Sequence, residues 1–321
     1  MLVLDRARIV ALTSLPELVE ELRVAFRSQC IIPPRQVMSM PGATGERLFI
    51  SMPAFSSEGA TTVKLVTFLP DNPANGRPTI QAVIVVFFEA GTPVALLDGS
   101  AVTQLRTSAA SALASQYLSP SDSSHLVVIG TGELAPMMAA AHCAVRPISR
   151  VSVWGRRHER AVATAGDIRR LVRREIEIAL PESLAEAVQS ADIVSCATGS
   201  TTPLLAGKWL RPGTFVDLIG SFSPSKREAD DDVVLRSRIF VDTLEGALAE
   251  AGDILHPLAR GIIQRERVVG ELADLVSGRQ GGRQSVDEII TFKSVGTALE
   301  DLAAARLIVA AAKSALAGER A

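Results

Sequence analysis

The chain has 321 residues, of which 47% are hydrophobic, and its formal net charge is −2. This size allows two domains with buried cores, and the balanced charge, without a long basic block, argues against a nucleic-acid partner. No apolar run reaches the roughly 18 residues that a membrane-spanning helix needs, so no membrane partner is expected.

The chain start and the cysteines indicate a cytoplasmic protein. Asp5 and Arg6 interrupt the first residues before the apolar core of a signal peptide could form. The three cysteines are odd in number and far apart, which is typical of reduced thiols. The four histidines lack the spacing of metal ligands, and no metal site is predicted.

The first hundred residues predict a mixed α and β domain. A helix is expected over residues 15–28, capped by Thr13 or Ser14. Strand-like runs, separated by Gly and Pro clusters, follow at residues 47–52, 62–68, 81–89 and 92–97. The almost wholly apolar run at 81–88 is expected to be buried on both faces. A helix rich in Ala and Ser is expected over residues 100–117, packed against the chain end.

Residues from about 121 to about 290 alternate strand with helix. Strands are expected at residues 126–129, 151–154, 176–179, 193–197, 215–219 and 239–241, with helices between them, for example at 137–145, 159–172 and 181–190. Such alternation predicts a doubly wound parallel sheet with right-handed crossovers. The apolar, Ala-rich helix at 296–317 resembles the helix at 100–117, so the chain is expected to return to its first domain.

The turn after the first of these strands is the most informative motif. Apolar residues 126–129 run directly into a G-x-G-x-x-A turn, and a helix of small residues follows. A turn without side chains at its glycines, opening a helix N-terminus, presents backbone N–H groups to a pyrophosphate. A dinucleotide is therefore predicted to contact Gly130, Thr131, Gly132, Glu133 and Leu134.

The end of the next strand predicts the type of dinucleotide. An NAD site carries an acid there, which accepts hydrogen bonds from the ribose 2′-hydroxyl. No acid stands between Arg150 and His158, and two arginines follow the strand instead. Their guanidinium groups can pair with a 2′-phosphate, which favours NADPH, with NADH as a weaker cofactor. The predicted contacts here are Trp154, Gly155, Arg156 and Arg157; alternatively, the arginines only solvate a strand end.

Two further loops and three cations complete the candidate residues. Residues 197–200 and 220–224 follow the fourth and fifth strands and fit a cofactor crevice, although each is also compatible with an ordinary helix-capping turn. Arg35, Lys64 and Arg106 lie in apolar surroundings, where a buried cation is costly unless it is paired. Three converging cations would bind a carboxylate. Alternatively, Lys64 is exposed on its strand and Arg106 lies on a solvated helix face.

The chain resembles the ornithine cyclodeaminase and mu-crystallin family in segments that cover nearly its whole length in order. These segments are residues 33–35, 51–54, 64–67, 95–99, 105–110, 130–132, 191–194, 208–213, 227–230 and 292–301. The resemblance implies a Rossmann domain at residues 120–293, inserted into an α+β domain formed by residues 1–119 and 294–321. The α+β domain would bind the substrate and form a homodimer.

The resemblance also implies roles for individual residues. Arg35, Lys64 and Arg106 match the family's catalytic and carboxylate-binding cations, and Met52 and Phe222 are expected beside them in the substrate site. Further cofactor contacts are expected from Thr107, Ala197, Thr198, Ile219, Ser294, Val295 and Gly296.

One position departs from the cyclodeaminases. Their loop after the fifth strand reads G-G-D-C-P-G-K, and its aspartate assists amine loss and ring closure. Here the loop reads G-S-F-S-P-S-K, with Phe222 in place of the aspartate. A phenyl ring neither binds an amino group nor transfers a proton, so cyclodeamination is disfavoured. The Arg-Glu-Ala-Asp-Asp continuation at residues 227–231 looks more like that of the family's ketimine reductases, which reduce Δ1-pyrroline-2-carboxylate and Δ1-piperideine-2-carboxylate to L-proline and L-pipecolate.

The predicted chemistry is NADPH-dependent reduction of such a cyclic imino acid. Phe222 would form an apolar wall for the ring, and Arg35 and Arg106 would hold its carboxylate and so place the imine carbon near the hydride. Lys64 or solvent would supply the proton. The alternatives are ornithine cyclodeaminase, an alanine dehydrogenase-like or N-alkyl amino acid dehydrogenase, and a non-catalytic NADPH- and ligand-binding protein of the mu-crystallin type.

Overall fold

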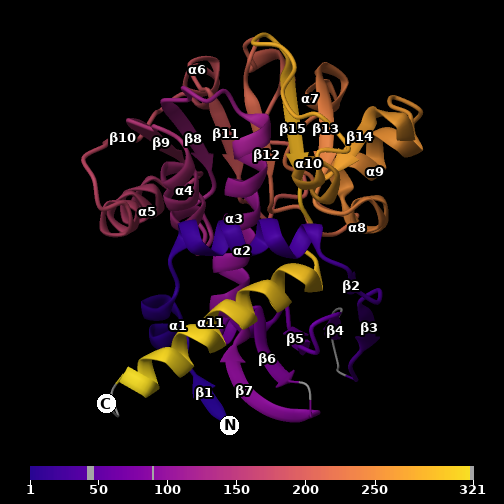
Figure 1. The fold of residues 1–321 in the computed structure, drawn as a ribbon. Coiled ribbons are helices and arrows are strands. Elements are labelled where there is room, and N and C mark those ends of the chain that lie inside the picture. Colours follow the sequence, from indigo (N-terminus) through magenta and orange to yellow (C-terminus); the bar gives the residue numbers. More distant parts are fainter. Residues whose placement is uncertain (42–46, 89, 319–321) are drawn as a thin grey trace. The chain divides into compact units, whose positions relative to one another are not determined.

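The computed structural model describes residues 1–41, 47–88 and 90–318, and the chain divides into two compact units (Figure 1). Unit 1 comprises Met1–Arg106 and Thr297–Ala321, and unit 2 comprises Thr107–Gly296. The boundary lies inside helix α3 (Gly99–Leu118), earlier than the expected boundary at residue 120. The assignment of substrate binding to the first unit and of nucleotide binding to the second stays a prediction.

Within its described residues, unit 1 is built on a mixed sheet of seven strands. Their order is β1-β7-β6-β5-β4-β2, with β3 paired to β4. The strands are β1 (Leu2–Leu4), β2 (Cys30–Ile31), β3 (Gln36–Ser39), β4 (Leu48–Ser56), β5 (Thr61–Phe68), β6 (Ile80–Phe88) and β7 (Thr92–Asp98). Among the strands that the structure describes in this unit, only β1 pairs in parallel, with β7. The four expected strand runs correspond to β4, β5, β6 and β7, and Glu89, which was included in the third run, lies outside the described residues.

Burial alternates along the central strands, so β6 is not buried on both faces as its apolar run predicted. Ile84 and Val86 are fully buried, whereas their neighbours Val83 and Val85 are only half-buried. The reason is that the C-terminal helix α11 (Ala298–Gly318) packs on β4, β5 and β6, on the face that carries Met52 and Ala54 of β4. One face of the sheet is therefore covered by the unit's own helix.

The first two helices of unit 1 begin after residues that commonly occupy N-cap positions. The Asp5 carboxylate caps helix α1 (Arg6–Leu12) by accepting from the Arg8 N–H. Helix α2 (Leu15–Arg27) begins after the expected residue Ser14, whose side chain makes no capping hydrogen bond, and has Pro16 in its first turn. Helix α11 packs on α2 and the sheet (Figure 1), rather than along α3 as expected from their small residues. Helix α3 meets the start of α11 through the ion pairs of Arg106.

Unit 2 contains a wholly parallel sheet of eight strands in the order β10-β9-β8-β11-β12-β15-β13-β14. They are β8 (His125–Ile129), β9 (Arg150–Trp154), β10 (Glu177–Ala179), β11 (Ile193–Cys196), β12 (Phe215–Leu218), β13 (Ser237–Val241), β14 (Val268–Glu271) and β15 (Ile289–Lys293). The chain order reverses between β8 and β11, which is the switch point where such sheets bind ligands. The predicted fold, a doubly wound parallel sheet inserted into a mixed α and β domain, is confirmed. Strands β14 and β15 were not predicted.

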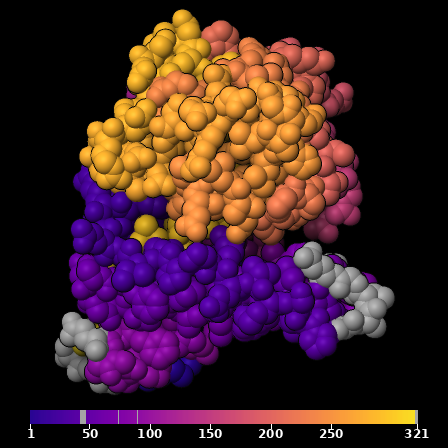
Figure 2. All heavy atoms as spheres, turned by 90° about the vertical axis from the view of Figure 1, so that its right-hand side faces the viewer, coloured from indigo at the N-terminus to yellow at the C-terminus, as the bar shows by residue number. Residues whose placement is uncertain are grey.

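Helices connect these strands. They are α4 (Ala135–Val145), α5 (His158–Leu171), α6 (Leu184–Gln189), α7 (Asp231–Arg236), α8 (Leu244–Glu250), α9 (Gly252–Ala259) and α10 (Leu272–Ser277). The segment from α7 to α9 forms the orange surface of Figure 2. Every residue of β8, β11, β12 and β15 is buried, as expected for parallel strands at the centre of an α/β sheet.

Candidate active site

The glycine turn lies at the carboxyl end of β8, directly at the switch point. Gly130 has a φ of +126°, and a Cβ atom added to it would lie 2.5 Å from the carbonyl oxygen of Ala197. Only glycine fits this position. Gly132 is exposed, and an added Cβ would meet nothing within 4 Å. The turn therefore approaches the next loop closely while leaving open space at its second glycine, where a pyrophosphate fits.

Backbone contacts join this turn to the neighbouring strand ends. The N–H of Gly130 donates to the carbonyl of Trp154, and the N–H of Ala197 donates to that of Ile129, both at 2.9 Å. A Cβ on Gly155 would lie 2.5 Å from the Thr131 methyl group. The turn at 130–134, the end of β9 and the start of the loop after β11 therefore form one edge, as the sequence predicted.

Arg156 and Arg157 follow β9 at this edge and are exposed. Arg157 occupies the N-cap of α5, and its Nε lies 3.9 Å from the carboxylate of Glu159. This exposed Arg157–Glu159 pair contributes little to stability at that distance. Arg156 has no ion-pair partner among the residues that the structure describes. Both guanidinium groups can therefore reach an added anion.

The loops after β11 and β12 are tied together by Glu228, a residue to which the sequence analysis assigned no role. Its fully buried carboxylate accepts hydrogen bonds from the N–H groups of Thr198 and Gly220, each at 2.7 Å, and of Ser221 at 3.2 Å. Ile219 is buried beside them and donates its N–H to Cys196. Thr198 and Ile219, both expected cofactor contacts, are thus brought together.

A buried cation lies next to Glu228. The ammonium of Lys293 is 3.9 Å from the Glu228 carboxylate and 3.4 Å from that of Asp253. All three side chains are fully buried. Burial raises the pKa of Glu228, and the Lys293 ammonium and the N–H groups of Thr198 and Gly220 oppose this shift.

The turn at 294–296, after β15, is held by another buried carboxylate. Asp242 accepts hydrogen bonds from the Ser294 hydroxyl at 2.9 Å and from the N–H groups of Val295 and Gly296 at 2.8 and 2.6 Å. Gly296 has a φ of +82°, which favours glycine. These three expected cofactor contacts therefore lie in a rigid turn at the same carboxyl edge. Thr107, also expected to contact the cofactor, is buried on α3.

In unit 1, Lys64 and Arg106 are both buried and share one carboxylate. The Lys64 ammonium lies 2.7 Å from Asp301 Oδ2, and Arg106 Nε lies 3.1 Å from Asp301 Oδ1. Arg106 Nη1 is also 2.6 Å from Glu300. The interpretations of Lys64 as an exposed strand charge and Arg106 as a solvated helix residue are therefore wrong. Both cations need partners because they are buried, and the first turn of α11 supplies them.

The electrostatics of this cluster make Lys64 titratable near neutral pH. Burial lowers the pKa of Lys64 to about 8; Asp301 opposes this shift, and Arg106 and Arg35 add to it. Burial acts against the ionised Asp301, but Lys64 and Arg106 hold its pKa below the usual value. Arg35 is half-buried and acts on Lys64 through its charge. Met52 is buried directly opposite Lys64 on the neighbouring strand.

Phe222, the residue that distinguishes this chain from the cyclodeaminases, is a half-buried residue of unit 2. It packs against the apolar cluster that contains Val241 and Val295. The Lys226 ammonium lies 4.0 Å from its ring centroid, and burial lowers the pKa of Lys226. The predicted apolar wall is therefore accompanied by a positive charge.

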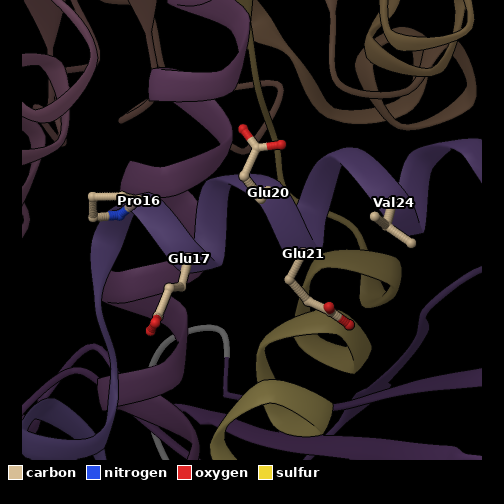
Figure 3. A pocket seen from close by; sticks show the side chains of 5 residues that line it. All are labelled: Pro16, Glu17, Glu20, Glu21 and Val24. Carbon is tan, nitrogen blue, oxygen red and sulfur yellow. The ribbon is translucent and has the colours of Figure 1, made fainter.

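A shallow pocket of about 410 Å³ lies elsewhere, along α2, and is lined by Pro16, Glu17, Glu20, Glu21 and Val24. Figure 3 shows that these side chains all come from one helix, with Glu20 on the opposite side from Glu17 and Glu21. Three carboxylates would repel an anionic substrate, so this pocket does not fit the predicted chemistry.

Within residues 1–41, 47–88 and 90–318, no group of three or more His, Cys, Asp and Glu side chains could hold a metal ion. None of the helices in these ranges has the length and apolar character needed to cross a membrane.

The fold and the glycine turn together define a dinucleotide-binding α/β protein. The Ornithine cyclodeaminase/mu-crystallin family matches residues 1–315, and the chain belongs to this family. A Delta(1)-pyrroline-2-carboxylate reductase from Colwellia psychrerythraea is 39% identical over 297 residues, which are 91% of this chain and 93% of that protein. The predicted family is therefore confirmed.

Solved structures agree with this assignment. Thermococcus litoralis Delta(1)-pyrroline-2-carboxylate reductase, in complex with NADH and L-proline, superposes with a TM-score of 0.92 and is 33% identical over 98% of both chains. An archaeal alanine dehydrogenase dimer with bound NAD has a TM-score of 0.89 and is 29% identical, over 98% of this chain and 96% of the other. The predicted enzyme class, a nicotinamide-dependent reductase of C=N bonds, is confirmed.

Proposed function

We propose that this protein uses NADPH to reduce a cyclic imino acid, Δ1-pyrroline-2-carboxylate or Δ1-piperideine-2-carboxylate, to L-proline or L-pipecolate. The observation that carries the proposal is the buried cluster of unit 1. Lys64, Arg106 and the nearby Arg35 bring three positive charges, and Glu300 and Asp301 bring two negative charges. Cations gathered at one site, two of them buried, suit a substrate with a carboxylate.

Each member of the cluster has a distinct task in this proposal. Arg35 and Arg106 bind the substrate carboxylate, and Arg106 is held for this purpose by Glu300 and Asp301. The bound nucleotide supplies a hydride to the imine carbon. Lys64, with its pKa lowered to about 8, donates the proton that the imine nitrogen gains. The carbon–nitrogen double bond thus becomes a secondary amine.

The preference for NADPH rests on the residues after β9. No acid follows this strand to accept from a ribose 2′-hydroxyl, and two exposed arginines stand there. Arg156, which has no ion-pair partner in the described part of the chain, takes the 2′-phosphate. The open space at Gly132 and the helix that begins at Ala135 receive the pyrophosphate.

Phe222 favours reduction over cyclodeamination. The phenyl ring gives the methylene groups of a cyclic substrate an apolar neighbour. It stands where the cyclodeaminases carry an aspartate, and it can neither bind the second ammonium of ornithine nor transfer a proton. Lys226 does not distinguish the two activities, because the cyclodeaminase loop ends in the same lysine.

The protein is proposed to act as a cytoplasmic homodimer. The face of the unit 1 sheet opposite to α11 presents half-buried apolar side chains that are cross-strand neighbours: Val63, Leu65, Val83, Val85 and Leu96. A continuous apolar sheet face is a typical site for association. Light scattering should give the mass of two chains; the mass of one chain at micromolar concentration would contradict the dimer.

A substrate panel followed by nucleotide absorbance at about 340 nm tests the function. Both cyclic imines, pyruvate with ammonia or methylamine, and L-ornithine are each assayed with NADPH and NADH. We expect nucleotide oxidation with a cyclic imine and formation of the cyclic amino acid. The proposal fails if only pyruvate with an amine is reduced, if ornithine releases ammonia and proline, or if nucleotide binds without any turnover.

A further inference from the structure

Two buried carboxylates, Glu228 and Asp242, organise the edge of the unit 2 sheet where the nucleotide is proposed to bind. Glu228 lies between β12 and α7, and its two oxygens accept from three backbone N–H groups, those of Thr198, Gly220 and Ser221. The first group belongs to the loop after β11 and the other two to the loop after β12. One side chain therefore fixes both loops.

The two loops also approach each other closely at Gly220. A Cβ atom on Gly220 would overlap the backbone of Thr198 and would lie 2.6 Å from Oε1 of Glu228. This contact leaves no room for any side chain at position 220. The carboxylate and the close contact thus determine the same local backbone arrangement.

The Glu228 side chain is itself held in place. Asp253 Oδ1 accepts from the N–H groups of Glu228 and Ala229, at 2.8 and 3.0 Å. The Lys293 ammonium lies beside both carboxylates and donates to the Leu218 carbonyl at 3.1 Å. The network of contacts around Glu228 therefore extends from the loops after β11 and β12 to Asp253 on α9 and Lys293 on β15.

Asp242 holds the turn after β15 through hydrogen bonds, as Glu228 holds the loops after β11 and β12. It follows β13, is fully buried, and accepts from the Ser294 hydroxyl and from the N–H groups of Val295 and Gly296. This turn lies next to β12, because the Ser294 N–H donates to the Leu218 carbonyl at 3.2 Å. The ends of four strands are thus linked through two carboxylates.

We propose that Glu228 and Asp242 are positioning residues for the nicotinamide nucleotide, which they do not touch. They hold the loops at 198–200 and 220–221 and the turn at 294–296 in the binding conformation before the nucleotide arrives. Preorganised loops do not have to be ordered on binding, so affinity is gained without any direct contact. The inference rests on the nucleotide binding proposed above, but not on the identity of the imine.

A purely structural role is the competing explanation, and Asp192 provides the matched control. Its carboxylate, partly buried where those of Glu228 and Asp242 are fully buried, accepts from the N–H groups of Ser124 and His125, at 2.7 and 2.9 Å. It also pairs with Arg211, much as Glu228 lies beside Lys293. These groups stand at the amino end of β8, opposite to the nucleotide edge. Asp192→Asn therefore removes the same kind of interaction from the same unit without affecting the proposed binding loops.

The experiment compares Glu228→Gln, Asp242→Asn and Asp192→Asn with the unchanged protein. Dissociation constants for NADPH and NADH are measured by fluorescence titration, together with the unfolding temperature and with kcat and KM. In Glu228→Gln an amide NH2 replaces one of the two oxygens that accept from the loops. In Asp242→Asn the NH2 faces either the turn at 294–296 or the N–H of Thr243, which donates to the other Asp242 oxygen. Either change leaves a backbone N–H donor without an acceptor, and we expect it to raise the dissociation constant at least ~10-fold. Asp192→Asn should lower the unfolding temperature and change the dissociation constant less than about twofold, within the scatter expected for a site without contact to the ligand.

Gly220→Ala keeps the inference testable if the carboxylate variants do not fold. It pushes the two loops apart while leaving every carboxylate in place, and we expect the same loss of nucleotide affinity. The inference is overturned if the folded variants bind nucleotide as the unchanged protein does, or if Asp192→Asn weakens binding equally. If the unchanged protein binds neither nucleotide, the proposed function fails as well.

Discussion

Asp301→Asn offers the sharpest test of the proposed proton donor. The Asp301 carboxylate lies 2.7 Å from the Lys64 ammonium, and both side chains are almost wholly buried, with exposures of 1% and 3%. The other charges that act on Lys64 are Arg106 on α3 and Arg35 before β3, and both disfavour its protonation. Asp301 is therefore the principal group that keeps Lys64 charged against burial. Asparagine preserves the shape of the side chain and removes the charge.

The size of the effect follows from the geometry. An opposite charge this close shifts a pKa by about 1–3 units. The pKa of Lys64 is about 8 with Asp301 present. A fall of one unit or more reduces the protonated fraction at about pH 7.5 from about three quarters to about a quarter or less. Since the ammonium form is the proton donor, activity is lost as pH rises through this pKa, and the variant should lose activity at a lower pH.

The assay is the pH profile of kcat/KM with NADPH and the preferred cyclic imine. The substrate's own titration is the same for every variant. A displacement of the alkaline limb of the pH profile therefore reports a change in the pKa of Lys64. Glu300→Gln is the matched control, because Glu300 contacts Arg106 and not Lys64. It should lower kcat/KM without moving the limb. A limb in Asp301→Asn at the position of the unchanged protein would refute this account of Lys64.

Three other substitutions test separate parts of the site. Lys64→Ala should lower kcat/KM at least ~10²-fold, whereas Lys313→Ala, at an exposed lysine of the same unit, should have no effect; near-normal turnover would exclude Lys64 from the chemistry. Arg156→Ala should raise the KM for NADPH and barely change that for NADH, with the exposed Arg160→Ala as control; equal losses with both nucleotides would contradict the 2′-phosphate contact. Phe222→Asp should weaken cyclic-imine reduction, and faster reduction would disprove the apolar-wall argument.

The fold was largely predictable because its signals are local. Alternation of strand and helix from about residue 121 indicates a parallel sheet, and the glycines at 130 and 132 mark the turn at its switch point. Strand β15 was not predicted, although it lies at the centre of this sheet between β12 and β13. Its short apolar run ends in Lys293, and periodicity cannot show that a lysine is buried. The preceding strand, β14, is short and contains Gly270.

The partners of the predicted cations were missed for a different reason. The segment that carries Glu300 and Asp301 was noted for its family resemblance, but no role was assigned to either residue. Two carboxylates in the first turn of a helix are typical of favourable dipole interactions at an exposed N-terminus. Only their burial against Lys64 and Arg106 shows that they are counter-charges. A paired charge therefore became recognisable once both partners were located.

Residue types and short spacings established the parallel sheet, the dinucleotide turn and the three cations, because each of these signals lies within one segment of the chain. Folding brought Asp301 to Lys64, Glu228 to the loops at 198 and 220, and Asp242 to the turn at 294–296. Those contacts join residues far apart in sequence, and their strength depends on burial, which lowers the local dielectric. The charge balance of the cluster and the rigidity of the nucleotide edge are therefore properties of the folded chain.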